Sequence, residues 1–479
     1  MTKNWFLVLL FLPFISFSQS VTDIVLTIDG ESVTKEEFEN IYKKNNRDSV
    51  VTQKALDDYM ELFINFKLKV HAAKELGLDT VKKFVNELAG YRSQLARPYL
   101  TDTDKLNDLM KEAYKFMGEE VRASHILVKC EPNASPQDTL KAFNKIMELR
   151  KRINAGEDFT TVAKSSGGSE DPSVTSNGGD LGYFTAFQMV YPFEKAAYAA
   201  KVGELSMPFR TRYGYHILKL TDRRQARGEI QVAHIVIRPK TETKGDEGAK
   251  LKLEEIRQKI VNGEETFEDM AKKYSDDPSS SKKGGELPWF GTGKMVPEFE
   301  DASFGLKADG DVSLPFKTDY GWHIVKRLKV RTIPTYSEAE KDLKNKVSKD
   351  GRSEQTRKSF VEKLKKECNY KVSADVFKKI VMAADSNALT GKLYIKDKDM
   401  KSVLFSYSGK SYTVAEFNEH FRTKGMGKAG TVPADHVTQF FNKLVEDKLI
   451  AEEDGKLELK HTPFRLLMKE YREGILLFE

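Results

Sequence analysis

The chain has 479 residues, which is too long for one hydrophobic core and leaves room for three or four domains. Its 39% apolar and 31% charged residues are typical of a folded globular protein. The 78 basic residues are interspersed with 72 acidic ones, and the net charge of +6 is small, which argues against a dedicated nucleic-acid-binding surface.

Residues 1–20 have the pattern of a cleavable export signal. Lys3 supplies a positive charge, residues 5–17 form an apolar run, and residues 16–18 place a serine at each end of a cleavage site. The apolar run is too short to span a bilayer comfortably, although an uncleaved anchor is the alternative. We therefore expect an exported chain, periplasmic or else secreted, with no integral membrane segment after cleavage.

Residues 21–119 and 332–479 are predicted to be mainly helical flanking modules that contain one related pattern. Each has a short hairpin with a glycine in its turn, followed by a capping box that begins a helix. These positions are Gly30, Thr34 and Glu37 in the first module, and Gly409, Thr413 and Glu416 in the second.

The start of the second flanking module is predicted to be a connecting helix. A capping box at Ser337 and Glu340 would begin this polar helix, which continues through Leu364. The last residues, 474–479, end in the middle of an apolar pattern without a cap. The sequence therefore either stops short of a domain end or closes on a buried terminal helix.

Only Cys130 and Cys368 are present, too few for a disulfide framework, and we expect free thiols or at most one bridge.

The central part of the chain contains one domain twice, over residues 120–224 and 228–331. His125 and His234 are 109 positions apart, and His216 and His323 are 107 positions apart. A glycine pair between the histidines keeps nearly the same spacing. Self-similarity at a fixed spacing indicates two tandem copies of one domain.

Each copy is predicted to run strand, helices, loop and strand. The β-branched residues that follow the first histidine of each copy are typical of a strand. Apolar residues at helical spacing follow over residues 140–153 and 251–260. The closing Tyr-Gly-aromatic-His segments again indicate strands. Short helices on a small antiparallel sheet give an α+β domain.

Between its histidines each copy carries Ser-acid-Asp-Pro, Gly-Gly-acid-Leu, a methionine, Phe-Glu and Pro-Phe-basic-Thr. This set of spaced residues resembles the parvulin family of peptidylprolyl isomerases. The resemblance covers about 210 residues. Two such domains with helical flanks behind an export signal are similar to the SurA-type periplasmic folding factors.

The resemblance implies two equivalent sites. Apolar residues would line a proline-binding pocket: Leu181, Phe184, Met189 and Phe193 in the first copy, and Leu287, Phe290, Met295 and Phe299 in the second. Paired histidines with an aspartate and a threonine would form the catalytic network: His125, Asp171, Thr211 and His216, and His234, Asp277, Thr318 and His323. An aspartate stands where some parvulins have cysteine, which excludes a thiol role.

Rotation about an Xaa-Pro amide faces a barrier of about 18–20 kcal/mol. A catalyst needs only to bind the twisted amide better than the planar one, so no cofactor or metal is expected. The sequence shows no serine elbow and no phosphate-binding loop.

We expect a peptidylprolyl isomerase and chaperone for unfolded exported or outer-membrane chains that contain Xaa-Pro bonds. The alternative is a holdase whose parvulin copies only bind peptide, with the helical flanks as the main binding cradle. The sequence leaves open the clients, the oligomeric state, the arrangement of the domains and the relative activity of the two copies.

Overall fold

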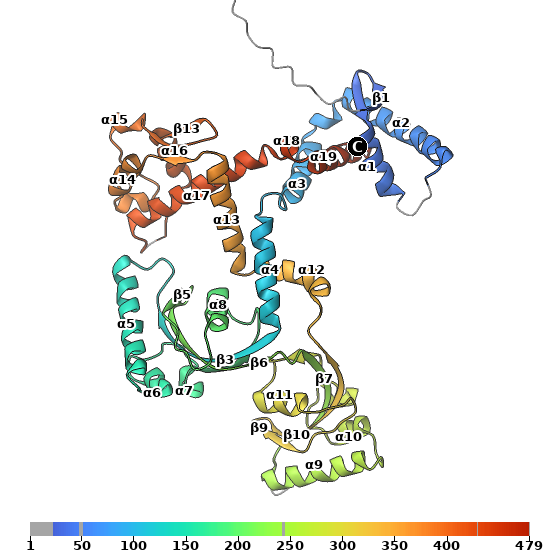
Figure 1. Cartoon of the computed structure of the whole chain (residues 1–479), viewed down its shortest axis with the longest axis vertical. Helices are drawn as coiled ribbons and strands as arrows, with labels where there is room; N and C mark the ends of the chain where they lie inside the picture. The colour runs from blue at the N-terminus through green and yellow to red at the C-terminus, as the bar shows by residue number, and fades with distance from the viewer. Residues whose placement is uncertain (1–22, 47–50, 242–244, 429, 479) are drawn as a thin grey trace, which may run out of the picture. The chain divides into compact units, whose positions relative to one another are not determined.

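The computed structural model describes residues 23–46, 51–241, 245–428 and 430–478, so the predicted export signal lies outside the described residues. The chain divides into two compact units (Figure 1). The residues up to Leu100 and those from Ala451 onward form the first unit, and Thr101–Ile450 form the second. The end of the second flanking module thus belongs with the N-terminal module. Across the residues that can be described, none of the helices has the length and apolar character needed to cross a bilayer.

The first unit begins with the predicted hairpin and helix. Strands β1 (Ile24–Ile28) and β2 (Glu31–Thr34) pair antiparallel around Asp29 and Gly30, whose φ angles of 45° and 80° suit a two-residue hairpin turn. Helix α1 (Lys35–Asn45) begins after Thr34, whose side chain accepts a hydrogen bond from the N–H of Glu37. The remaining helices of this unit are α2 (Gln53–Glu75), the 3₁₀ turn η1 (Leu78–Thr80), α3 (Lys82–Ala96), α18 (Leu457–Lys460) and α19 (Thr462–Phe478).

A buried cluster of charges ties α19 to the N-terminal helices. Lys67 on α2 is 6% exposed and contacts both Glu37 of α1 and Glu473 of α19, the latter at 2.5 Å. Lys469 donates to the other oxygen of Glu37 at 2.6 Å. Because Glu37 is engaged here, the capping box predicted at Thr34 is present only in its first half. Breaking a buried ion pair costs about 3–5 kcal/mol, so this cluster fixes the last helix in the first unit.

The second unit contains the two predicted central domains, each with a four-stranded antiparallel sheet. The strand orders are β4-β3-β6-β5 in the first central domain and β8-β7-β10-β9 in the second. The first sheet comprises β3 (Glu119–Lys129), β4 (Asp180–Phe184), β5 (Phe209–Thr211) and β6 (Gly214–Gln225). The second comprises β7 (Glu229–Ile237), β8 (Phe290–Gly291), β9 (Phe316–Thr318) and β10 (Gly321–Arg331). The predicted α+β class is confirmed.

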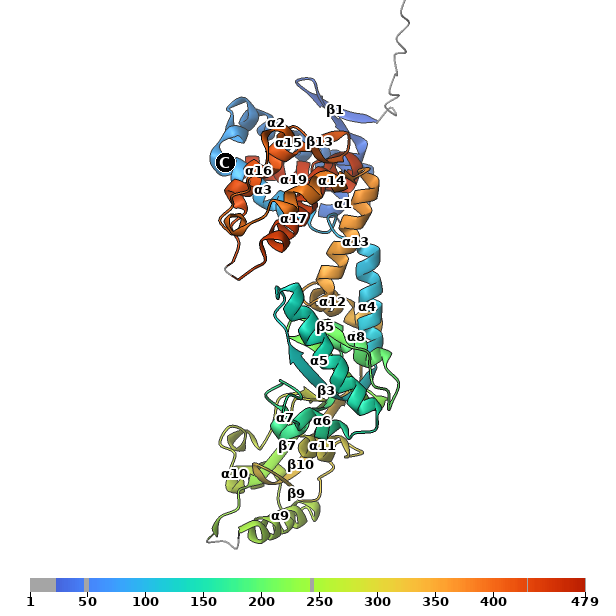
Figure 2. The same ribbon diagram turned by 90° about the vertical axis from the view of Figure 1, so that its left-hand side faces the viewer.

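Helices cover both faces of these sheets. In the first central domain they are α5 (Pro136–Asn154), α6 (Phe159–Lys164), α7 (Val174–Asn177) and α8 (Tyr191–Ala199). In the second they are α9 (Gly245–Val261), α10 (Phe267–Tyr274), η3 (Ser281–Lys283) and α11 (Pro297–Phe304). Successive residues of β3 point to opposite faces, so Ile126 packs in the cluster under α5 while Ala123 packs in the cluster under α8. Figure 2 shows the same elements from the side.

Helices from outside the repeat pack against the first central domain. Helix α4 (Thr103–Met117) and α12 (Tyr336–Val347) share a buried cluster that also contains Tyr191 of α8. The predicted capping box at Ser337 and Glu340 was wrong. Thr335 and Glu338 form it instead, because the helix begins two residues earlier. The predicted single connecting helix is two helices, α12 and α13 (Arg352–Glu367).

The rest of the second unit repeats the hairpin-helix pattern. Strands β12 (Val403–Tyr407) and β13 (Lys410–Thr413) precede α16 (Val414–Lys424), and the capping box of Thr413 and Glu416 is complete. The other elements are β11 (Lys371–Val372), α14 (Ala374–Met382), η4 (Ser386–Leu389), α15 (Asp397–Met400) and α17 (Pro433–Asp454), whose residues from Ala451 onward are assigned to the first unit. Cys130 and Cys368 are buried free thiols, in agreement with the sequence.

Candidate functional site

The first central domain places two imidazoles side by side. In the pairing of β3 with β6, His125 lies opposite Leu218, and Leu127 lies opposite His216. The two histidines are therefore diagonal neighbours on one face of the sheet. Their ring centroids are 5.7 Å apart, with planes 17° from parallel.

The second central domain repeats this arrangement. In the pairing of β7 with β10, His234 lies opposite Val325, and Val236 lies opposite His323. The ring centroids are 5.9 Å apart and the planes are 19° from parallel. The register of the two central strands, preserved in both domains, is what brings together histidines about ninety residues apart in sequence.

The second glycine of the repeated pair packs against the backbone of the first histidine in each domain, at a position where a side chain would not fit. Gly179 and Gly285 have φ angles of 92° and 83°, and their carbonyls accept the N–H of His125 and His234 at 2.8 Å. A Cβ on Gly179 would lie 2.6 Å from the carbonyl oxygen of His125, and one on Gly285 would lie 2.3 Å from that of His234. Only glycine lets the loop approach the histidine strand this closely.

Aromatic rings enclose the imidazole pair. The ring of Phe193 on α8 is nearly perpendicular to those of His125 and His216, with centroid distances of 5.5 and 5.6 Å. Phe209 stacks on His216 at 5.5 Å. The equivalent rings in the second central domain are Phe299 and Phe316. Sequence reasoning assigned no role to Phe209 and Phe316, although the repeated Pro-Phe-basic-Thr segment signalled them.

A cavity of about 640 Å³ opens over the imidazoles of the second central domain. Tyr320 and the residues of the 293–297 loop are part of its lining. Seven of the eight residues predicted for this site line it: His234, Asp277, Leu287, Met295, Phe299, Thr318 and His323.

The eighth predicted residue, Phe290, is not in the lining and is a buried core residue, 3% exposed. Phe184 of the first domain is likewise buried in the core, 2% exposed. Leu181 and Met189 are partly buried and pack against the same cluster as Phe193. The structure therefore places Phe184 and Phe290 behind the apolar residues that face the imidazoles.

Threonine and aspartate side chains next to the imidazoles form hydrogen bonds with their Nε2 atoms. The hydroxyl of Thr211 lies 2.8 Å from Nε2 of His216, and Thr318 lies 2.8 Å from Nε2 of His323. In the second domain, Oδ2 of Asp277 lies 2.8 Å from Nε2 of His234.

The first domain differs at this contact. Oδ2 of Asp171 lies 3.2 Å from Nε2 of His125, without the alignment of a hydrogen bond. The predicted aspartates thus stand beside the first histidine in both domains, but at different distances.

Burial keeps the imidazoles neutral. It lowers the pKa of all four histidines, and for His216 and His323 the charge of the neighbouring imidazole adds to the effect, which brings the pKa of each to about 4. Burial acts to raise the pKa of Asp277, but hydrogen bonds from Ser280 and His234 outweigh it and hold that pKa well below the usual range. Each site at neutral pH is an ionised carboxylate beside two neutral rings.

A buried glutamate that sequence reasoning missed follows the pocket phenylalanine in each domain. Glu194 accepts the N–H of Phe187 at 2.8 Å, and Glu300 accepts those of Lys294 and Met295 at 2.9 Å. Burial raises the pKa of both glutamates. These carboxylates hold the loop that carries the pocket methionine. The repeated Phe-Glu pair was the available signal.

The two loops are held differently. Phe187 has a φ of 67°, which favours glycine, and its counterpart is Gly293 with a φ of 76°. The strained Phe187 lies over the guanidinium of Arg352, which is fully buried and pairs with Glu194. The first pocket loop is thereby attached to α13.

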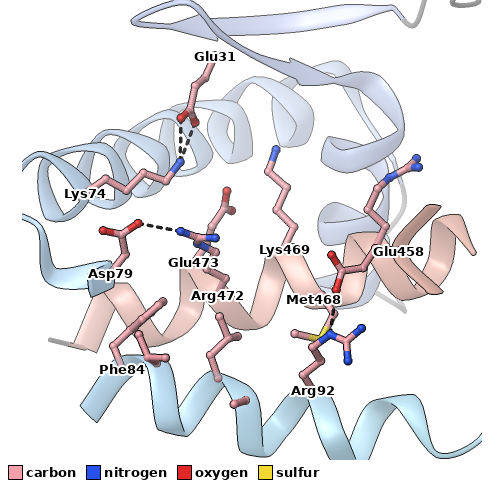
Figure 3. A pocket seen from close by; sticks show the side chains of 14 residues that line it. Glu31, Lys74, Asp79, Phe84, Arg92, Glu458, Met468, Lys469, Arg472 and Glu473 are labelled. Carbon is pink, nitrogen blue, oxygen red and sulfur yellow. Dashed lines mark hydrogen bonds and ion pairs between the residues drawn. The ribbon is translucent and has the colours of Figure 1, made fainter. Parts of the chain in front are cut away.

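A second concave surface lies within the first unit. A cleft of about 780 Å³ between α3 and α19 has Phe84, Leu88 and Met468 among its apolar lining residues (Figure 3). Its charged lining is paired: Lys74 with Glu31 at 2.7 Å, Arg472 with Asp79 at 2.7 Å, and Arg92 with Glu458 at 3.1 Å. The cleft therefore combines apolar side chains with charged side chains of both signs.

The central domains match a known family. The family described as Rotamase, PPIC-type PPIASE domain, matches residues 125–222 and 234–329. Both central domains belong to the parvulin family. The two matches coincide with the two sheets and their imidazole pairs.

The chain is also similar to named chaperones. It is 34% identical to "Chaperone SurA" of Pseudomonas fluorescens (strain Pf-5) over 227 residues, 47% of this chain and 52% of that one. It is 33% identical to "Chaperone SurA" of Idiomarina loihiensis over 245 residues, 50% of this chain and 55% of that one. The chain thus spans about half the length of the curated relatives it matches. Among solved structures, a PpiC-type peptidyl-prolyl cis-trans isomerase domain is 25% identical over 23% of this chain and 95% of its own, with a TM-score of 0.21.

The neutral imidazoles of the parvulin domains give a prediction about pH. In the folded chain His216 and His323 should become half protonated near pH 4, whereas an unfolded chain takes up these protons near pH 6.5. Because the folded-state pKa is lowered, the stability these groups contribute is complete above pH 6.5 and is lost as the pH falls toward 4. The loss is on the order of 3 kcal/mol for each ring. NMR titration of ¹³Cε1-labelled histidine measures the protonation directly, and titration of both rings near pH 6.5 would contradict the prediction.

Proposed function

We propose that this protein is a peptidylprolyl cis-trans isomerase and chaperone that acts on unfolded, exported polypeptides. The observation that carries the proposal is the cavity over paired neutral imidazoles in the second parvulin domain, lined by Leu287, Met295 and Phe299. Similarity to proteins named Chaperone SurA supports the chaperone part.

The apolar lining would hold the proline ring of a client. Leu287, Met295 and Phe299 supply a surface that excludes water and contacts one side of the Xaa-Pro bond. With the ring held, the chain on the other side of the amide can turn. Nothing is cleaved or transferred, so the site requires no nucleophile.

The polar base of the pocket would stabilise the twisted amide. Rotation breaks the resonance that makes the planar amide strongly dipolar, and an apolar pocket wall that displaces water from the amide favours the less dipolar form. Neutral imidazoles suit this role because they add hydrogen-bonding capacity without a net charge. Thr318 and Asp277 orient His323 and His234 through their hydrogen bonds. Thr211 and Asp171 stand at the equivalent positions of the first domain.

Alanine substitution of the pocket tests the isomerase proposal. The intact chain should accelerate cis-trans exchange of a short proline peptide, measured by exchange NMR. Leu287→Ala with Met295→Ala should lower kcat/KM of the second pocket roughly tenfold or more, because the proline ring loses its apolar contacts. Leu181→Ala with Met189→Ala should do the same for the first pocket, and the two effects can be measured separately and together.

A matched control is Leu251→Ala in the same domain, since this leucine on α9 is 50% exposed and lies outside the cavity lining. It should leave the exchange rate unchanged. If the intact chain binds the peptide yet never accelerates exchange, the isomerase proposal is wrong and the protein is a holdase with parvulin peptide-binding modules.

The cleft in the first unit is the proposed chaperone surface. Its apolar lining can accept the side chains of an unfolded segment, while its mixed charges tolerate many sequences. The predicted clients are unfolded outer-membrane or secreted chains, met in the periplasm. The export signal and this location remain predictions from sequence.

Placing a charge in the cleft tests this assignment. Val85 lines the cleft and is 49% exposed, so Val85→Asp should fold normally and weaken client binding about tenfold by burying a carboxylate against apolar client side chains. Leu62→Asp is the control, because Leu62 on α2 is 66% exposed and does not line the cleft. Suppression of aggregation of a urea-unfolded outer-membrane barrel chain provides the measurement. Equal loss in both variants would show that the cleft has no special part.

A further inference from the structure

One buried position distinguishes the hydrogen bonding of the two parvulin sites. Three residues after the site aspartate, the first domain has Val174 and the second has Ser280, and both side chains are buried. The neighbouring bonds are otherwise alike. Ser173 and Ser279 each donate a hydroxyl, at 2.7 Å, to Oδ1 of their aspartate. The two domains therefore allow one site with a hydroxyl at this position to be compared with one that lacks it.

In the second domain this hydroxyl completes a closed set of contacts. Oγ of Ser280 lies 3.0 Å from Nε2 of His234 and donates to Oδ2 of Asp277. The same Oδ2 lies 2.8 Å from Nε2 of His234. An ionised carboxylate can only accept, so Nε2 must carry the hydrogen, which is shared between Oδ2 and Oγ. His234 is thus held in one tautomer and one orientation.

In the first domain the equivalent imidazole has a longer and less well aligned contact with its aspartate. Val174 packs with Phe159 and Val162 in the core and has no hydroxyl to offer. Neither ring nitrogen of His125 has a hydrogen-bond partner, and its Nε2 is 3.2 Å from Asp171 without hydrogen-bond alignment. The absence of this hydroxyl coincides with a lengthened histidine-aspartate contact, 3.2 Å in the first domain against 2.8 Å in the second.

We propose that Ser280 is a positioning residue of the second pocket and that it fixes the tautomer and orientation of His234 through Asp277. The first pocket lacks this function because Val174 at the equivalent position has no hydroxyl. The proposal rests on the isomerase function proposed above. A ring that is already oriented needs no rearrangement when the amide twists, and this preorganisation is the usual source of electrostatic catalysis in buried sites. Ser280 does not line the cavity, so it acts through His234 and not on the client.

The first test is spectroscopic and does not depend on catalysis. With ¹⁵N-labelled histidine in the full chain, His234 should show the shifts of a pure Nε2–H tautomer. Ser280→Val should change them toward a mixture, whereas Ser280→Thr, which has the shape of valine but keeps the hydroxyl, should retain them. Val174→Ser should move His125 toward the pure Nε2–H signature. The valine variant should fold, because the first domain already accommodates valine at this position.

The second test measures activity. In a chain with Leu181→Ala and Met189→Ala, Ser280→Val should lower kcat/KM for a proline peptide about tenfold, the loss expected for one hydrogen bond, with peptide affinity unchanged. Ser280→Thr should retain the activity. With Leu287→Ala and Met295→Ala instead, Val174→Ser should raise the remaining activity.

The outcomes distinguish failure of the Ser280 proposal from failure of the proposed isomerase function. Unchanged histidine shifts in Ser280→Val would overturn it, and so would changed shifts with unchanged activity of the second pocket. If no form of the chain accelerates exchange, the isomerase function fails, and the shifts alone then decide whether Ser280 positions His234.

Discussion

The account of this protein depends on the antiparallel pairing of the two long strands in each parvulin domain. That pairing places two histidines diagonally on one face of the sheet, in contact with a phenylalanine. Burial there lowers the pKa of the histidines, so that they are neutral at neutral pH. A neutral imidazole pair under an apolar cavity is suited to a reaction with no ionic intermediate. The same burial would be unfavourable for a hydrolase, which needs a base near neutral pH. The chemistry proposed for the site therefore follows from strand register and burial.

The two domains use one fold in different surroundings. Tyr191 and Phe187 of the first domain pack against helices from outside the repeat, and the buried Arg352 pairs with its Glu194. The second domain has Pro297 and Gly293 at these positions, and there the loop lines an open cavity. The loop of the first domain therefore packs against the helical scaffold, whereas the equivalent loop of the second domain lines a cavity.

Much of the site was predictable because it repeats. The kept spacing of the histidines, the glycine pair and the Phe-Glu pair indicated one domain twice, and the structure places the predicted histidines, aspartates and threonines together in both copies. Phe184 and Phe290 were predicted to line the pockets but are buried in the core, because the alternation of residues along a strand does not distinguish a pocket wall from the core behind it. Ser280 could not be singled out, because a hydroxyl at this position matters only through a contact that folding creates.

Long-range contacts determine parts of the fold that the sequence pattern did not predict. The sequence presented two flanking modules, but the pairing of Lys67 with Glu473 joins the last helix to the first ones. Nothing local in either helix marks its partner. Helix starts were also ambiguous, because Thr335 with Glu338 and Ser337 with Glu340 both match the capping-box pattern, and only the first pair forms the box in the structure.

The central claim is that the cavity of the second parvulin domain binds the prolyl ring of a client. Its most direct test is methyl NMR of the full chain, labelled at the methionine methyl groups, during addition of an unfolded peptide with one Ala-Pro bond or of its Ala-Ala counterpart. The account predicts that the Met295 signal shifts with the proline peptide and far less with the counterpart, while Met468 in the cleft responds to both alike. Equal responses of Met295 to the two peptides would contradict it.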